Sequence, residues 1–104
     1  MIKPELAIIW SREAETDLID IWLYGAQEHS PGAADRHLRA IDTACKRLVN
    51  WPHSGRARSE IAHGLRSVSV TPHVVFYRVT SAAVEIVRVL HARREVNAIF
   101  TEDQ

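Results

Sequence analysis

The sequence lacks several features that define particular classes of protein. It contains one cysteine among 104 residues, so an internal disulfide is excluded. The apolar run Leu6–Trp10 near the N-terminus is too short for a signal-peptide core, and no run approaches the length of a membrane span. The net charge is zero, which argues against a dedicated nucleic-acid binder. We therefore expect a cytoplasmic protein with a reduced cysteine, no membrane association and no direct binding of nucleic acid.

The residues that usually ligate metals are also sparse. The six histidines show no tight spacing with cysteine or with acidic residues, so we expect neither a metal site nor a cofactor. Cys45 occupies an apolar position of a predicted helix, which favours a buried structural thiol over a nucleophile.

Lysine is absent from the segment Gly55–Arg94, where arginine supplies all the positive charge. The segment holds seven arginines against two acidic residues, a local charge of +5, whereas residues 1–54 carry −2 and the tail from Glu95 carries −3. Arginine presents a planar fork of donors that suits carboxylate or phosphate, so this segregated charge predicts an anionic partner. The candidate partner-binding residues are Arg56, Arg58, Arg66, Arg78, Arg88, Arg93 and Arg94.

The first half of the sequence predicts a strand followed by two helices. Leu6–Trp10 is a short run with β-branched and aromatic residues, typical of a strand. Ser11 is a good N-cap for a helix that ends near residue 29, and Ser30 with Pro31 starts a second helix that ends at Asn50. The short connection makes the helices an antiparallel hairpin. The two apolar stripes are Ala14, Leu18, Ile21, Trp22 and Ala26, then Ala34, Leu38, Ile41, Cys45, Leu48 and Val49.

The second half predicts a loop from Trp51 to His63 and then a three-stranded antiparallel meander. Its strands are Leu65–Val70, Val74–Thr80 and Val84–Arg93, which short connections separate. Residues 95–100 form either a short helix or a mobile tail, and three apolar side chains there suggest that it docks. The fold class is therefore α+β in one domain over residues 1–104, with the hairpin on one face of a mainly antiparallel sheet. The arginines on the other face are left for partners.

Several short segments, taken in this order, match a known family. They are Trp10; Ala14, Asp17-Leu18, Ile21 and Tyr24; Leu48, Pro52 and Gly55-Arg56; Gly64-Leu65-Arg66; Val75-Phe76-Tyr77-Arg78; Ile86-Val87-Arg88-Val89-Leu90-His91; and Arg93-Arg94. The chain resembles the RelE/ParE superfamily of toxins from bacterial toxin–antitoxin pairs, and its last blocks resemble the ParE branch in particular.

The resemblance implies a type II toxin that a co-expressed ParD-like antitoxin neutralises by wrapping its acidic C-terminal tail around it. In the ParE branch it further implies inhibition of DNA gyrase by direct binding, in systems that stabilise plasmids or chromosomes, so that the protein is not itself an enzyme. An acidic antitoxin tail would satisfy the arginine face. We expect the tail to lie in a groove along the sheet and the hairpin and to cover apolar side chains around Trp22 and Leu23.

Two alternatives stay open. The first is a RelE-like, ribosome-dependent mRNA endonuclease, which needs a base, an acid and cations on the phosphate. Glu60, Arg78 and His91 fall at comparable places, but Trp51–Arg66 contains no lysine and no tyrosine follows the last strand. A histidine that caps the strand end or bonds to the antitoxin is the simpler role for His91. The second alternative is an inactive fold that only binds antitoxin.

Overall fold

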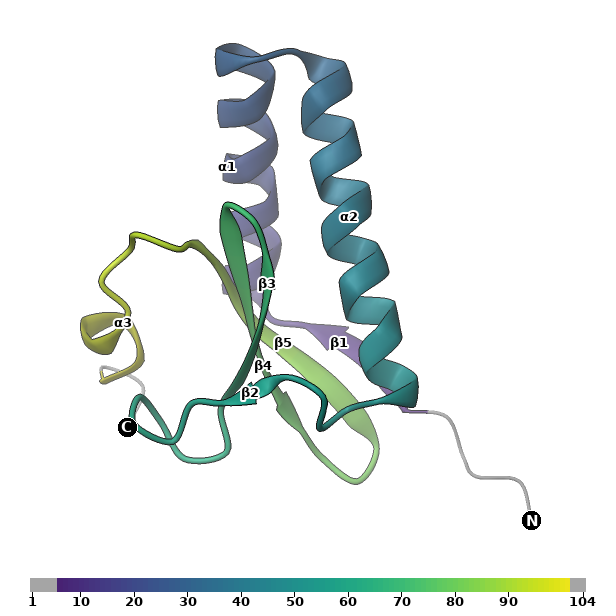
Figure 1. Ribbon diagram of the computed structural model, residues 1–104, viewed down its shortest axis with the longest axis vertical. Coiled ribbons are helices and arrows are strands. Elements are labelled where there is room, and N and C mark those ends of the chain that lie inside the picture. Colours follow the sequence, from purple (N-terminus) through teal and green to yellow (C-terminus); the bar gives the residue numbers. More distant parts are fainter. Residues whose placement is uncertain (1–5, 102–104) are drawn as a thin grey trace.

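A helical hairpin packs on one face of a five-stranded sheet in the computed structural model, which describes residues 6–101 (Figure 1). The predicted α+β fold is confirmed. The elements in chain order are β1 (Ala7–Trp10), α1 (Arg12–Glu28), α2 (Pro31–Asn50), β2 (Arg56–Ala57), β3 (Arg66–Val70), β4 (His73–Val79), β5 (Ala83–His91) and α3 (Asn97–Thr101).

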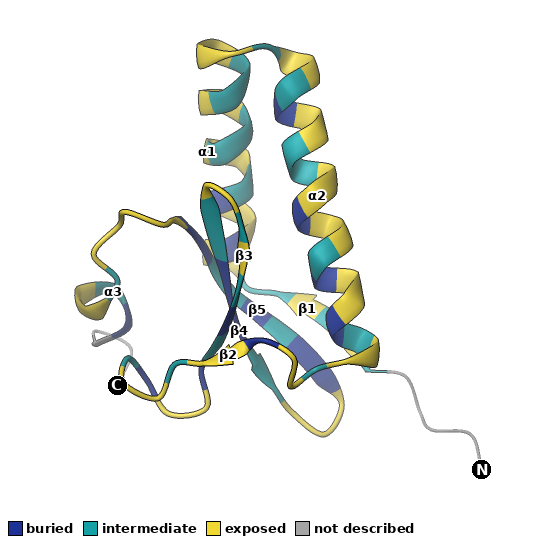
Figure 2. Ribbon diagram, in the orientation of Figure 1, coloured by how far each residue is buried: buried dark blue, intermediate teal, exposed yellow. Residues whose placement is uncertain are grey.

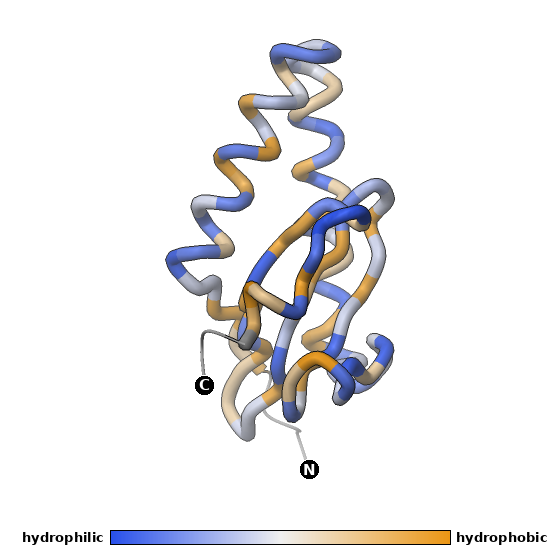
Figure 3. Tube along the Cα trace, turned by 90° about the vertical axis from the view of Figure 1, so that its left-hand side faces the viewer, coloured by the Kyte–Doolittle hydropathy of each residue, from blue (hydrophilic) through white to orange (hydrophobic). Residues whose placement is uncertain are grey.

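Both helices begin at the predicted caps. The Ser11 hydroxyl accepts a hydrogen bond of 2.9 Å from the Ala14 amide, and the Ser30 hydroxyl accepts one of 3.0 Å from the Ala33 amide. Each bond satisfies one of the amides that the first turn of a helix leaves unpaired. Hydrophobic residues recur along each helix between hydrophilic ones, which gives the hairpin its apolar stripes (Figure 3). Within residues 6–101, neither helix has the length and apolar character needed to cross a membrane.

The sheet has the strand order β1-β5-β4-β3-β2, so the first strand lies beside the last. The pairing of β1 with β5 is parallel, and the other three pairings are antiparallel. The predicted meander is thereby confirmed within one or two residues at each end. The loop prediction was wrong at Arg56–Ala57, which pair with β3. Two exposed residues carry no alternation that a sequence pattern could reveal.

The main core lies between the hairpin and the sheet, and we call it the hairpin cluster. It takes apolar residues from both helices and from β4 and β5, and buried residues lie along these elements (Figure 2). Cys45 is buried, as predicted, and its burial, with a contribution from Asp42, raises the pKa of the thiol to about 12, which disfavours the nucleophilic thiolate. The cluster is Ala14, Ile41, Cys45, Leu48, Val75, Tyr77, Val84, Ile86 and Val89.

The opposite face of the sheet carries a second core, which we call the outer cluster. It consists of Ala62, Leu65, Phe76, Leu90 and Phe100. Phe100 belongs to α3 and packs on Phe76 with ring centroids 5.2 Å apart. The predicted short helix therefore exists and docks. The face that we expected to be left for partners is partly covered by this cluster, because α3 returns over it.

Candidate functional site

The seven candidate arginines fall into two groups. Arg58, Arg66, Arg78 and Arg88 bind other groups of this chain through their guanidinium nitrogens. The side chains of the other three make no hydrogen bond or ion pair within residues 6–101, and they are exposed. The exposed group is Arg56, Arg93 and Arg94.

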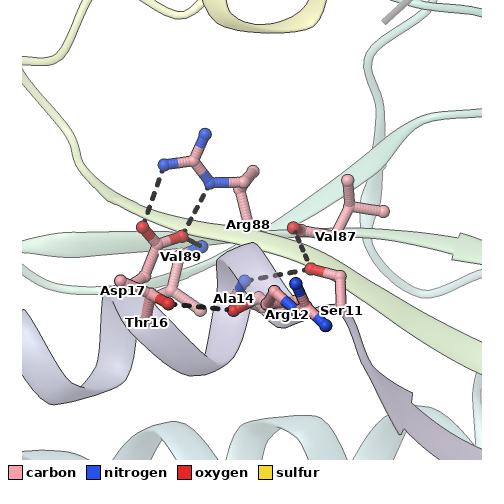
Figure 4. Close-up of polar contacts among 8 residues, drawn as sticks. All are labelled: Ser11, Arg12, Ala14, Thr16, Asp17, Val87, Arg88 and Val89. Carbon is pink, nitrogen blue, oxygen red and sulfur yellow. Dashed lines mark hydrogen bonds and ion pairs between the residues drawn. The ribbon is translucent and has the colours of Figure 1, made fainter.

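Arg88 is bound to a carboxylate of α1 that the sequence did not single out as its partner (Figure 4). Arg88 Nε donates to Asp17 Oδ2 at 2.8 Å, and Nη2 donates to Oδ1 at 2.9 Å. The Val89 amide donates to the same Oδ2 at 2.9 Å. The side chains of Arg88 and Asp17 are 20% and 11% exposed. Two parallel charge-assisted bonds away from water make this pair a structural tether between α1 and β5.

A β-bulge brings the tether into position. Phe76 pairs with Arg88 and Tyr77 pairs with Ile86, so β5 contains one extra residue, Val87, at this point. The start of α1 lies against β5 here, because the Ser11 amide donates to the Ile86 carbonyl at 3.0 Å and the Ser11 hydroxyl donates to the Val87 carbonyl at 2.7 Å (Figure 4). The bulge interrupts the regular alternation of side chains along β5, so alternation in the sequence does not give the direction of the Arg88 side chain.

Arg66 and Tyr77 hold the loop after α2. Arg66 Nη1 donates to the carbonyls of His53 and Gly55 at 3.1 and 2.8 Å. The Tyr77 hydroxyl donates to the Pro52 carbonyl at 2.8 Å and accepts from the Gly55 amide at 2.9 Å. Burial raises the pKa of Tyr77, although the Gly55 bond and the nearby Arg66 act in the opposite direction. The tyrosine is a neutral anchor of the loop.

Gly55 has no room for a side chain beside this anchor. A Cβ there would lie 2.3 Å from the Tyr77 hydroxyl and 2.8 Å from the Ser67 carbonyl. The glycine of the Gly55-Arg56 pair in the family resemblance therefore has a packing role.

Arg58 and Glu60 neutralise each other on the loop before β3. Arg58 Nε donates to Glu60 Oε2 at 2.8 Å, while Arg58 Nη1 donates to Ser67 Oγ at 3.2 Å. The guanidinium of Arg58 also lies over the Phe76 ring, 5.7 Å from its centroid. The hydrogen bond from Arg58 lowers the pKa of Glu60, with smaller contributions from the charges of Arg58 and Arg56. The neighbouring cation therefore stabilises the ionised form of Glu60, whereas a general acid must carry a proton to donate.

The three residues of the endonuclease alternative do not form one constellation. In the β4–β5 ladder His91 pairs with His73, and Arg78 lies five positions further along β4, so about 16 Å of strand separates Arg78 from His91. Arg78 Nε instead donates to the His63 carbonyl at 3.5 Å. A base and an acid must reach atoms of the same phosphodiester, and this register keeps them apart.

Histidines that are distant in sequence meet where the hairpin passes the turn between β3 and β4. His37 Nε2 and His73 Nδ1 are 2.8 Å apart, and the rings of His73 and His91 are 5.5 Å apart, edge to face. No local spacing in the sequence groups these histidines, because they come from α2, β4 and β5. No set of three or more metal-ligating side chains in the described part of the chain is arranged to hold an ion.

A shallow groove on the hairpin exposes apolar side chains. Ile19 and Leu23 of α1 are 60% and 55% exposed, as expected around Trp22 and Leu23. The Trp22 ring spans the two helices, and its Nε1 donates to Asp35 Oδ1 at 2.8 Å. Exposed apolar side chains that adjoin one another indicate a surface that a partner covers. The groove is lined by Leu18, Ile19, Trp22, Leu23 and Leu38.

The fold is similar to that of chains in two solved structures. A structure described as the chromosomal ParDE TA system from P. aeruginosa superposes with a TM-score of 0.74 at 22% identity, covering 84% of this chain and 96% of that one. A second, the E. coli DinJ-YafQ toxin-antitoxin complex, superposes with a TM-score of 0.53 at 17% identity, covering 93% and 99%.

The sequence comparisons are more specific. The chain is 36% identical to Toxin ParE1 of Mycobacterium tuberculosis (H37Rv) over 84% of its length and 90% of that protein. It is 35% identical to Toxin ParE1 of Caulobacter vibrioides over 85% and 91%, and 37% identical to Toxin RelE2 of the same organism over 84% and 96%. The profile of the family described as "ParE toxin of type II toxin-antitoxin system, parDE" matches residues 8–96. The chain belongs to this ParE toxin family, within the RelE/ParE superfamily.

Proposed function

We propose that this protein is a cytoplasmic toxin that inhibits DNA gyrase by direct binding and is kept inactive by a cognate, ParD-like antitoxin. Its membership of the ParE toxin family is the observation that carries the proposal. The surfaces agree with a role in binding. Three exposed arginines offer charge to an acidic protein segment, and the apolar groove on the hairpin offers a surface for its hydrophobic side chains.

The antitoxin is proposed to lay an apolar helical face over the hairpin groove and to pair its acidic tail with Arg56, Arg93 and Arg94. The neighbouring structures are described as toxin–antitoxin systems or complexes, which supports a partner of this kind. A tail that is disordered when free loses conformational entropy on binding, and the burial of apolar anchors such as Leu23 offsets that cost.

The likeness to Toxin RelE2 is the observation that favours a second function, mRNA cleavage. The arrangement of the candidate catalytic side chains does not support it. Glu60 is bound to Arg58, and the register of β4 and β5 separates Arg78 from His91. We therefore propose inhibition by binding as the function.

Purified toxin tested in a gyrase supercoiling assay separates these functions. We expect loss of supercoiling, accumulation of cleaved DNA, and recovery when the antitoxin encoded beside the toxin is added. Expression without antitoxin should give filamentous cells with DNA damage signalling. Rapid arrest of translation with cut transcripts, lost in a His91→Ala variant, would instead establish the endonuclease. Harmless expression with normal gyrase activity would indicate an inactive module that only binds antitoxin.

A further inference from the structure

A pocket of about 350 Å³ lies between the hairpin and the start of β4. Ile21, Tyr24 and Ala34 contribute to its apolar wall. The rest of its lining includes four of the six histidines of the sequence, which makes it unlike the apolar groove on the hairpin. They are His29 at the end of α1, His37 on α2, His73 on β4 and His91 on β5.

Burial disfavours the charged form of two of these histidines, His37 and His73. A hydrogen bond between His37 Nε2 and His73 Nδ1 needs one nitrogen with a proton and one without. His91 Nδ1 accepts a hydrogen bond from the Arg93 amide at 3.1 Å, so Nε2 is the ring nitrogen of His91 that is left to donate. Burial, and then the proximity of His37 and His91, lowers the pKa of His73 to about 4. Burial also lowers the pKa of His37.

No negative charge balances the imidazoles from within the pocket. In the described part of the chain, the lining contains no carboxylate and no guanidinium, and the only other titratable side chain in it is the phenol of Tyr24. The imidazoles of His37 on α2 and His91 on β5 face His73, and the end of α1 contributes His29 and the phenol of Tyr24 to the same lining. An occupant that brought a carboxylate would favour the charged form of these imidazoles.

We propose that this pocket receives an acidic side chain of the antitoxin tail, and that the histidine cluster takes up a proton when the complex forms. The inference rests on the proposed antitoxin and names the site of one of its acidic residues. The apolar wall accommodates the methylene groups of a glutamate, while its carboxylate accepts hydrogen bonds from imidazole N–H groups. Tyr24 directly follows Leu23 in α1, so a segment lying over this helix reaches both the groove and the pocket.

The proposal has a thermodynamic signature. A carboxylate beside an imidazole favours the charged imidazolium, and the proton then comes from solvent. Uptake of one proton makes the association constant rise by up to about tenfold for each unit that the pH falls. An apolar occupant would give the opposite dependence, because it would bury the imidazoles further and disfavour their protonation.

Calorimetric titration of the toxin with the purified antitoxin from the adjacent reading frame tests the proposal. Measurements at pH 6, 7 and 8, in two buffers of different ionisation enthalpy, give both the affinity and the number of protons taken up. We expect tighter binding and proton uptake towards pH 6, lost in His73→Phe and retained in His63→Gln, whose exposed side chain lies outside the pocket. Binding that is independent of pH, or that weakens as the pH falls, would overturn the proposal.

Two further results keep the test decisive. If His73→Phe does not fold, the histidine resonances of the wild-type protein in nuclear magnetic resonance spectra report the protonation of the cluster directly. The pKa of a histidine in the cluster should rise in the complex, and an unchanged value for all of them would overturn the proposal. An antitoxin that binds without proton uptake contradicts only this inference, whereas one that fails to bind at every pH contradicts the proposed function.

Discussion

Asp17 and Arg88 are 71 residues apart in the sequence and form a two-pronged ion pair between α1 and β5. The same carboxylate accepts the Val89 amide next to the bulge. One aspartate therefore fixes the position of a helix, the direction of an arginine and an irregular strand. The pair leaves the Arg88 side chain only 20% exposed.

Replacement of Asp17 by asparagine should destabilise the fold. It removes the charge of the carboxylate that two guanidinium nitrogens of Arg88 bind, at a cost of about 2–4 kcal/mol in the free energy of unfolding. Urea unfolding measures the loss. Asp42→Asn is the matched control, because Asp42 pairs with Lys46 on the exposed side of α2, and it should leave the unfolding midpoint nearly unchanged. Equal effects of the two variants would contradict the tether.

The exposed arginines should affect binding and leave stability intact. Arg93→Glu combined with Arg94→Glu reverses two charges that have no ion pair within the described chain, so the melting temperature should stay close to wild type. Affinity for the antitoxin should fall by about tenfold or more, chiefly through slower association, and the loss should shrink at high salt. Arg88→Met should instead lower the melting temperature. Unchanged affinity in the double variant would exclude these arginines from the interface.

The Gly55→Ala substitution should destabilise the protein strongly, although it adds only one methyl group. The added methyl group would lie 2.3 Å from the Tyr77 hydroxyl, so the loop must move and its hydrogen bonds to the tyrosine must break. We expect a cost of about 2–4 kcal/mol, measured by thermal unfolding. Gly32→Ala, in the first turn of α2, meets nothing nearer than 3.5 Å and should stabilise by about 0.5–1 kcal/mol.

The free toxin should lose stability as the pH falls from about 6.5 towards about 4. These limits are the ordinary pKa of histidine and the lowered pKa of His73. The folded state disfavours the charged imidazole, so the contribution of His73 is fully present above the ordinary pKa and is lost as the pH falls to the lowered one. His73→Phe removes this component, and its free energy of unfolding should vary less between pH 7 and pH 5. The same slope in wild type and variant would show that other groups set the acid sensitivity.

Much of the fold could be predicted because its determinants are local. Ser11 and Ser30 act on amides three residues ahead, and the helix and strand stripes repeat over a few residues, so their boundaries follow from short-range chemistry. The docking of α3 was likewise visible in the apolar residues around Phe100.

The arrangement of the candidate site was less predictable, because it depends on contacts that no local pattern encodes. One extra residue at Val87 decides where Arg88 points, and the alternation of side chains in the sequence does not show where a bulge falls. The histidine pocket joins His37 and His73, 36 positions apart, through the packing of a helix on a strand end. Periodicity revealed the elements, and only their packing revealed these neighbours.

The parallel pairing of β1 with β5 has a consequence for how the protein is made. Ribosomes deliver β1 and the hairpin first, but the strand beside β1 and the acceptor of the Ser11 amide both belong to β5. The apolar stripe of the hairpin has no complete sheet to cover until residue 91 has left the ribosome. We therefore expect a truncated translation product that ends before β5 to lack the folded core, because β5 supplies both the partner of β1 and part of the hairpin cluster.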